Sequence, residues 1–208
     1  MRVAEKFNFR INTFTHILEG YKVADKMKKH GVGASTFADW WAYKMEVMQA
    51  IPYNAAILNK VGIITAINSD DAEMGRRLNQ EAGKIVKYGN VSEEDAWKMV
   101  TLNPAKLLHL DNKIGSIKVG KDADVVLWSG NPLSNFSIAL QTYVDGIKYY
   151  DREEDILLQE EIQQEKSRII QKMITEKKAG TQTQPVIIKS QPSYHCDDFG
   201  IYHELIKY

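Results

Sequence analysis

The sequence predicts an α/β protein built from parallel βα units, and three features indicate this class. Residues 63–67, Ile-Ile-Thr-Ala-Ile, form a run without polar alternation, which is typical of a strand buried on both faces of a parallel sheet. Strand-like and helix-like segments alternate over residues 10–108, and such alternation implies parallel strands joined by right-handed helical crossovers. After residue 110 the pattern changes to short β-prone segments and turns. We therefore expect βα units followed by a small β module.

Length, charge and cysteine content exclude several classes of protein. The chain has 208 residues, enough for one or two domains with a sizeable core. Lys and Arg together number 27, as do Asp and Glu, so no net field favours nucleic acid or a membrane as a partner. The single cysteine, Cys196, excludes an internal disulfide framework and a cysteine-based zinc cluster. No apolar run approaches the roughly 20 residues of a membrane span, and no signal-peptide core is present. We expect a soluble protein, cytoplasmic by default.

The first two predicted strands lie early in the chain. Residues 10–17 are strand-like, and His16 lies at the carboxyl end of this segment. A helix is expected to begin at Gly20 and to end before Gly31, because glycine is a common helix terminator. Residues 32–37 are β-prone and supply the second strand.

Helices precede and follow the third strand. Apolar residues at helical spacing predict a helix over residues 47–61, which ends at Gly62. A further helix is expected over residues 71–88. Ser92, followed by an acid three residues later, resembles a capping box at the start of a helix that runs towards Leu108.

The later part of the chain predicts β structure and then one long helix. Residues 125–128 are strand-like, and residues 143–149 resemble a hairpin with Asp145-Gly146 as its turn. Residues 151–179 are highly charged, and their apolar residues are spaced for a long amphipathic helix. From Gly180 the chain is rich in Gln, Thr, Pro and Ser, which is typical of a loose tail.

Two carboxylates follow the third predicted strand directly. The strand ends in Asn68-Ser69-Asp70-Asp71, and parallel α/β folds build their sites at the carboxyl ends of strands. Asp70 or Asp71 can equally cap the next helix, because Asp is common immediately before a helix. Both interpretations are open at this point.

Several motifs follow one another in a specific order along the chain. They are His16 at a strand end, Asp70 at a strand end two βα units later, Asn103-Pro104-Ala105, Gly115-Ser116-Ile117 and Gly120-Lys121-Asp122-Ala123-Asp124-Val125-Val126. In this order they resemble the amidohydrolase superfamily, most of all its imidazolonepropionase-related metal-dependent hydrolases. The resemblance covers about residues 1–150 and implies the C-terminal part of a TIM (β/α)8 barrel, about three βα units long, followed by a β-sandwich portion and a C-terminal helix.

This resemblance, with the patterns above, gives four expected regions. Residues 1–110 would form a partial TIM-barrel metal-dependent hydrolase domain, and residues 111–150 a portion of a composite β-sandwich. Residues 151–179 would form the charged amphipathic helix, and residues 180–208 the tail. The helix and the tail match no motif of the superfamily.

The resemblance also implies roles for the strand-end residues. His16 matches the metal-site histidine of the sixth barrel strand, and Asp70 matches the aspartate that ends the eighth strand. In a rival register His16 and Glu19 would be the His-x-x-Glu of the fifth strand. That register is disfavoured because it needs a second histidine-bearing strand before Asp70, and none is predicted.

Family members bind one or two divalent metals, usually zinc, so the resemblance implies metal-activated water that attacks a non-peptide carbon–nitrogen bond. His16 would be a metal ligand or a group that polarises the substrate, and Asp70 a ligand that also accepts the proton of the water. Four further residues are expected to bind or orient a small-molecule substrate: Glu19, Trp41, Lys44 and Arg76. Packing against the barrel rim is an equal alternative for the Trp41 segment, and a solvated position is the alternative for Arg76.

The chain departs from the family pattern in one large respect. A complete barrel takes about 250 residues, and the His-x-His of the first strand is missing, as is the ligand of the fifth strand. We therefore expect a C-terminal fragment that is inactive alone. The alternative is an inactive remnant or interaction module that forms a homo-oligomer or pairs with a separate N-terminal half.

Overall fold

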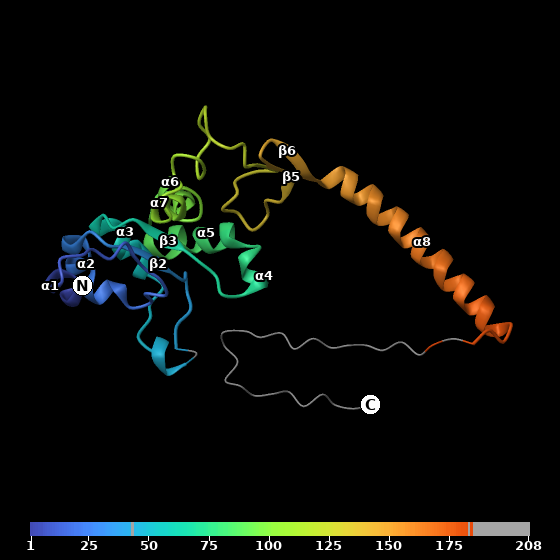
Figure 1. Ribbon diagram of the computed structural model, residues 1–208, viewed down its shortest axis with the longest axis horizontal. Coiled ribbons are helices and arrows are strands. Elements are labelled where there is room, and N and C mark those ends of the chain that lie inside the picture. Colours follow the sequence, from blue (N-terminus) through green and yellow to red (C-terminus); the bar gives the residue numbers. More distant parts are fainter. Residues whose placement is uncertain (43, 183, 185–208) are drawn as a thin grey trace. The chain divides into compact units, whose positions relative to one another are not determined.

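A three-stranded parallel sheet lies at the centre of the first part of the chain (Figure 1). The computed structural model describes residues 1–42, 44–182 and 184. The strands are β1 (Thr13–Phe14), β2 (Gly33–Thr36) and β3 (Thr65–Ile67), in the order β1-β2-β3. Both pairs of neighbours are parallel, with Thr13 opposite Gly33 and Ala34 opposite Thr65. The predicted parallel α/β class is thereby confirmed.

Helices connect these strands and continue after β3. They are α1 (Arg2–Lys6), the 3-10 helix η1 (Gly20–Val23), α2 (Ala24–His30), the 3-10 helix η2 (Met45–Val47), α3 (Asn54–Val61), α4 (Ala72–Gly75), α5 (Leu78–Gly89), α6 (Glu93–Lys98) and α7 (Leu102–Leu107). Gly31 and Gly62 end α2 and α3 in the left-handed conformation, with φ of 82° and 87°. Only glycine adopts this conformation without strain, so both predicted helix ends are confirmed.

Two predicted helices are shorter or broken because of proline. The helix expected from residue 47 begins only at Asn54, two residues after Pro52. Pro104 lies in the first turn of α7, where its missing N–H does no harm. In the interior of one continuous helix over residues 92–108, Pro104 would remove a backbone bond and clash with the preceding turn. The segment accordingly divides into α6 and α7.

Two clusters of buried side chains form the core, one that includes Ala34 of β2 and one that includes Ile67 of β3. Met27 of α2 and Leu58 of α3 pack with Ala34 of β2 in one cluster. Ile85 of α5 and Met99, just after α6, belong to the other cluster. The helices therefore cover β2 and β3, whose residues are nearly all buried, whereas β1 is half-buried.

The edge of β3 that faces away from β2 is hydrogen-bonded by the segment after α6. The side-chain amide of Asn103 donates to the carbonyl oxygen of Thr65 at 2.8 Å. The backbone N–H of Ile67 donates to the carbonyl oxygen of Met99 at 2.9 Å. An unpaired strand edge is a liability in water, and these two bonds give Asn103 of the Asn-Pro-Ala motif a physical role.

A second, separate sheet follows the helices. Its strands are β4 (Val125–Trp128), β5 (Ala139–Val144) and β6 (Ile147–Asp151), in that order, and β4 and β5 are antiparallel. The turn between β5 and β6 is Asp145-Gly146, with φ of 51° and 75°. Positive φ at both positions is typical of a two-residue hairpin turn, so the predicted turn is confirmed. A composite β-sandwich stays a prediction.

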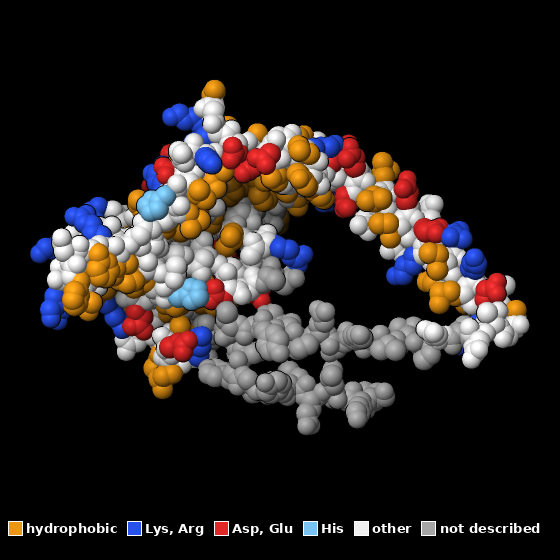
Figure 2. Space-filling model, viewed as in Figure 1, with side chains coloured by type: hydrophobic (Ala, Val, Ile, Leu, Met, Phe, Trp, Pro, Cys, Tyr) orange, Lys and Arg blue, Asp and Glu red, His pale blue; other side chains and the backbone are white. Residues whose placement is uncertain are grey.

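The chain divides into two compact units, Met1–Tyr149 and Tyr150–Tyr208. The described part of the second unit is chiefly α8 (Arg152–Lys178), where the amphipathic spacing predicts a helix. Asp151 caps α8 by accepting from the N–H groups of Glu153 and Glu154. None of its residues is buried, and Figure 2 shows hydrophobic side chains exposed along it. The predicted tail lies mostly outside the described residues. Among the residues that the structure describes, no helix is long and apolar enough to cross a membrane.

Leu58→Ala tests the core between α2, α3 and β2. We expect the substitution to lower the free energy of unfolding by about 2–5 kcal/mol, because Leu58 is fully buried and its loss leaves a cavity. Leu108→Ala is the matched control: Leu108 is exposed, so its change should stay within about 0.5 kcal/mol. Urea unfolding followed by tryptophan fluorescence measures both. Equal effects would contradict this assignment of the core.

Candidate functional site

His16 and Asp70 meet at the carboxyl edge of the parallel sheet. His16 follows β1 by two residues, and Asp70 follows β3 by three. Because the strands are parallel, their carboxyl ends lie at the same edge. The Nε2 atom of His16 lies 3.0 Å from Oδ1 of Asp70. The structure thus brings together the two principal candidate residues, while their chemical roles stay predictions.

The backbone at His16 is unusual and helps to present its ring. The strand predicted over residues 10–17 ends at Phe14, and His16 has a φ of 54°, a left-handed conformation. Its side chain is 53% exposed, against 19% for Asp70. After this turn the chain returns to the sheet, where the N–H of Ile17 donates to the carbonyl oxygen of Ser35 at 3.2 Å. His16 therefore projects from a short loop fixed on both sides.

An aromatic layer lies beside the His16 ring. Phe37, which follows β2, has its ring centroid 5.3 Å from that of His16. Trp40 stacks on Phe37 with a centroid distance of 4.8 Å. Trp41, the predicted substrate-binding residue, is 46% exposed and lies next to Trp40 in sequence; its role towards a substrate stays a prediction. The doublet Trp40-Trp41 could not be resolved by sequence because both residues lie in one irregular segment.

The two adjacent aspartates have different roles. Oδ1 of Asp71 accepts from the N–H of Met74 at 2.9 Å, which makes Asp71 the N-cap of α4. Asp70 contacts His16 instead. The capping interpretation is therefore correct for Asp71, and Asp70 is directed to the site.

Asn54, which sequence reasoning missed, fastens the loop that carries His16. It is 1% exposed at the start of α3. Its Oδ1 accepts from the N–H of Tyr21 at 2.8 Å, and its Nδ2 donates to the carbonyl oxygen of Ile17 and to Oγ1 of Thr36. Both groups of the amide are thus satisfied, as burial requires. The signal in the sequence was a polar side chain at position 54, directly before the apolar residues 55–58.

Lys84 of α5 braces the segment that follows β2. Its Nζ lies 2.9 Å from Oδ1 of Asp39 and 2.9 Å from Oε1 of Glu81, whose side chain is 7% exposed. Burial by itself would lower the pKa of Lys84, but the hydrogen bonds and charges of Glu81 and Asp39 together outweigh it and raise that pKa above its ordinary value. The ammonium group therefore stays charged and holds the segment to α5.

The four predicted substrate-binding residues are not gathered as closely as the central pair. Glu19 forms an ion pair with Lys22 at 2.5 Å, and Lys44 forms one with Glu46 at 2.6 Å. Arg76 directly follows α4 and is exposed, like Trp41. Their role towards a substrate stays a prediction.

His16 and Asp70 are residue types that bind zinc, but they are only two. A catalytic zinc normally has about three protein ligands and a water. Among residues 1–42, 44–182 and 184, no group of three or more His, Cys, Asp or Glu side chains could hold a metal ion. The pair fits part of a metal site and falls short of a whole one.

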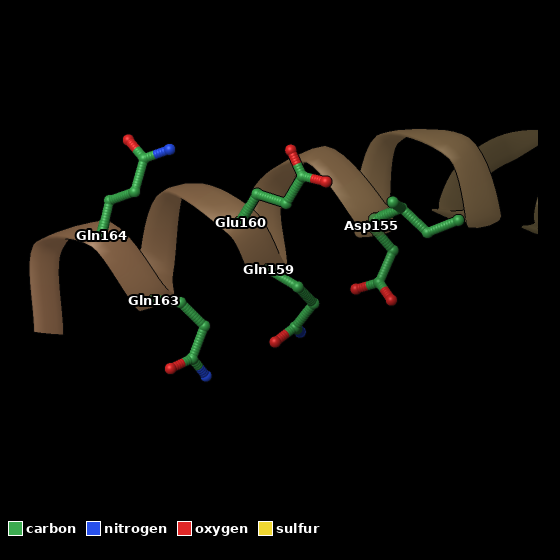
Figure 3. Close-up of a pocket in the computed structure, with 6 residues that line it drawn as sticks. Asp155, Gln159, Glu160, Gln163 and Gln164 are labelled. Carbon is green, nitrogen blue, oxygen red and sulfur yellow. The ribbon is translucent and has the colours of Figure 1, made fainter. Parts of the chain in front are cut away.

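A hollow of about 480 Å³ on α8 is not a competing site. Figure 3 shows its lining residues, among them Asp155, Gln159 and Gln163 on one side of the helix and Glu160 on the other. All of its walls come from this single helix. Ligand pockets bury most of a ligand's surface, which one helix does not do.

The chain is similar to hydrolases of one family. A sequence profile described as "Amidohydrolase family" matches residues 12–148. Amidohydrolase tasK of Hapsidospora irregularis is 29% identical over 153 residues, which cover 71% of this chain and 16% of the relative. Imidazolonepropionase of Picrophilus torridus is 29% identical over 101 residues, covering 46% of this chain and 26% of the relative.

Solved structures share the fold. The amidohydrolase from Thermotoga maritima is 32% identical with a TM-score of 0.66, covering 73% of this chain and 39% of that one. An adenosine deaminase from Xanthomonas campestris with bound zinc is 15% identical with a TM-score of 0.55, covering 82% and 45%. This chain therefore spans less than half the length of each of these proteins.

Asn54→Leu tests the anchoring of the loop after β1. The substitution keeps the side chain's size but leaves the N–H of Tyr21 and the carbonyl of Ile17 without their partner. We expect faster amide hydrogen exchange at Tyr21 and a loss of about 1–3 kcal/mol of unfolding free energy. Asn59→Leu, at a half-buried position of the same helix, is the control and should leave exchange at Tyr21 unchanged. Slow exchange in the Asn54 variant would show that the loop is held by other contacts.

Lys84→Met tests the brace between α5 and Asp39. It leaves the buried carboxylate of Glu81 without its cation, so we expect a loss of about 1–2 kcal/mol after allowance for solvent screening. A raised lysine pKa stabilises the fold fully below the ordinary value of 10.5, and this stabilisation is lost as pH rises through the raised pKa. The difference from the unsubstituted chain should be constant near neutral pH and shrink above pH 10.5. Lys87→Met, at an exposed position of α5, should show neither effect in urea titrations across pH.

Proposed function

Because the chain belongs to the amidohydrolase family, we propose that it carries part of the active site of a hydrolase that cleaves carbon–nitrogen bonds other than peptide bonds. The observation that carries the proposal is the contact between His16 and Asp70 at the carboxyl edge of the parallel sheet. In α/β folds with parallel strands, ligands bind at this edge. If His16 were only a structural core histidine, its side chain would be buried, but it is 53% exposed.

We further propose that the site holds a divalent metal, with zinc as the first candidate. His16 and Asp70 would be two of its ligands, and the others would come from outside this chain. The bound zinc of the Xanthomonas campestris neighbour supports the choice of metal. This chain covers 45% of that neighbour, which supports a site whose remaining ligands lie outside this chain.

The residues of this chain would supply proton transfer and orientation. A bound divalent metal would provide a water of lowered pKa. The carboxylate of Asp70 would accept the proton of the attacking water and return it to the departing nitrogen as the carbon–nitrogen bond breaks. The ring of His16 would be held in place by Phe37 on one side and by the loop anchored at Asn54.

The substrate would be a small molecule with a non-peptide carbon–nitrogen bond, as in the imidazolonepropionase-like members. The partial match to imidazolonepropionase supports this finer assignment. Trp41, Lys44 and Arg76 lie after the carboxyl ends of β2 and β3, and Glu19 follows β1. We propose that these four contact or orient the substrate.

Asp70→Asn tests the proton-transfer role in a protein that joins this chain to the missing barrel strands. We expect kcat to fall about 10²–10⁴-fold, because an amide cannot accept the proton. Asp71→Asn is the matched control: it is adjacent and isosteric, and asparagine caps a helix as well as aspartate does. Its kcat should be unchanged on the same substrates, a panel of cyclic amides and N-acyl amines.

The outcomes separate the proposal from its rival. If Asp70→Asn keeps full activity, Asp70 is not the proton acceptor. Residues 1–208 alone should show negligible activity and weak zinc binding, since two ligands are too few. Tight stoichiometric zinc binding by the isolated chain would contradict the proposal that ligands come from outside it.

A further inference from the structure

The helix α8 carries an exposed apolar stripe with a defined period. Its main members are Leu158, Ile162, Ile169 and Met173, which are 44–58% exposed. Leu158 and Ile169 are eleven residues apart, as are Ile162 and Met173. Eleven residues are close to three turns of helix, so the four side chains lie on one side. We call this set the α8 stripe.

Charge is divided sharply between the two halves of the same helix. Residues 152–165 contain six acids and one base, a net charge of −5, and residues 166–178 contain five bases and one acid, a net charge of +4. Figure 2 shows acidic side chains over the first half of α8 and basic ones over the second. A helix with this pattern complements a second copy of itself when the two run in opposite directions.

The helix dipole does not explain the division. Acids near the start and bases near the end of a helix stabilise it, but the effect falls off within the first and last turns. Here the acids continue to Glu165 and the bases begin at Lys166, in the middle of a helix 27 residues long. At this border Glu165 pairs with Arg168 within the helix, at 2.6 Å.

The polar face also argues against a lipid surface as the occupant. Helices that lie on anionic membranes carry Lys and Arg along the whole polar face. The first half of α8 is acidic, and the net charge of residues 152–178 is −1. An acidic half would be repelled where the apolar stripe would need to insert.

We propose that the α8 stripe is an interface for α8 of a second copy of this chain, with the two helices antiparallel. The acidic half of each helix then lies along the basic half of the other, which gives electrostatic complementarity. A parallel pair would place acid on acid and base on base instead.

The sequence of α8 fits one register of this pair. When Ile162 faces Ile169 of the second copy, Leu158 faces Met173, because both pairs share a midpoint between Glu165 and Lys166. Lys166 interrupts the stripe, and in this register it lies near Glu165 of the second copy. In a parallel pair Lys166 would face another Lys166.

Analytical ultracentrifugation of the full chain tests the interface. We expect a reversible dimer, and we expect Ile162→Glu with Ile169→Glu to raise its dissociation constant more than about tenfold. Gln164→Glu with Gln171→Glu is the control, with the same spacing and added charge on the opposite side of the helix. Its dissociation constant should change less than about threefold, and circular dichroism should show that both variants stay helical.

Disulfide cross-linking tests the orientation in a Cys196→Ser background. Leu158→Cys with Met173→Cys should form an interchain disulfide under mild oxidation, because these positions face each other in the antiparallel pair. Leu158→Cys alone should not. Cross-linking of the single variant would show a parallel pair and overturn the proposal.

Two results of the centrifugation would also overturn it. The unsubstituted chain could stay monomeric over the whole concentration range, in which case α8 has no such partner. Alternatively, the Ile162 and Ile169 variant could associate as tightly as the unsubstituted chain. Association would then go through another surface, such as an edge of the parallel sheet.

Discussion

Parallel pairing of β1, β2 and β3 is the constraint on which the rest of the first unit depends. Parallel neighbours cannot be joined by a tight turn, so each connection must cross over the sheet, and here helices provide these crossovers. The same constraint sends every carboxyl end to one edge. His16 and Asp70, 54 positions apart in sequence, therefore come within 3.0 Å of each other.

The two outer strands of this sheet, β1 and β3, differ in the hydrogen bonds along their outer edges. Asn103 and Met99 satisfy backbone groups of β3 on the side away from β2. Among the described residues, β1 has β2 as its one strand neighbour. An open strand edge can pair with a further strand, so in the proposed partial barrel an additional strand would pair with β1.

Polar side chains with buried partners keep the site's loops in position. Asn54 joins the segment after His16 to β2, and Lys84 joins the segment after β2 to α5. A buried polar group that loses a hydrogen-bond partner destabilises the fold. A buried side chain with all of its hydrogen bonds made therefore favours one conformation of the loop that it holds. The charges of α8 are exposed instead, with acids in its first half and bases in its second. This separation is the basis of the antiparallel interface proposed above.

The sequence by itself determined the local features of this protein. The alternation of strands and helices, the helix ends at Gly31 and Gly62, the cap at Ser92 and the Asp145-Gly146 turn depend on a few neighbouring residues. The order of motifs also identified the family. Only the tertiary structure decided that Asp71 is the cap while Asp70 meets His16, that Trp40 rather than Trp41 joins the aromatic layer, and that Asn54 holds the loop. Each of these depends on partners distant in sequence, and neighbouring residues of the same type differ only in the direction that the folded backbone gives them.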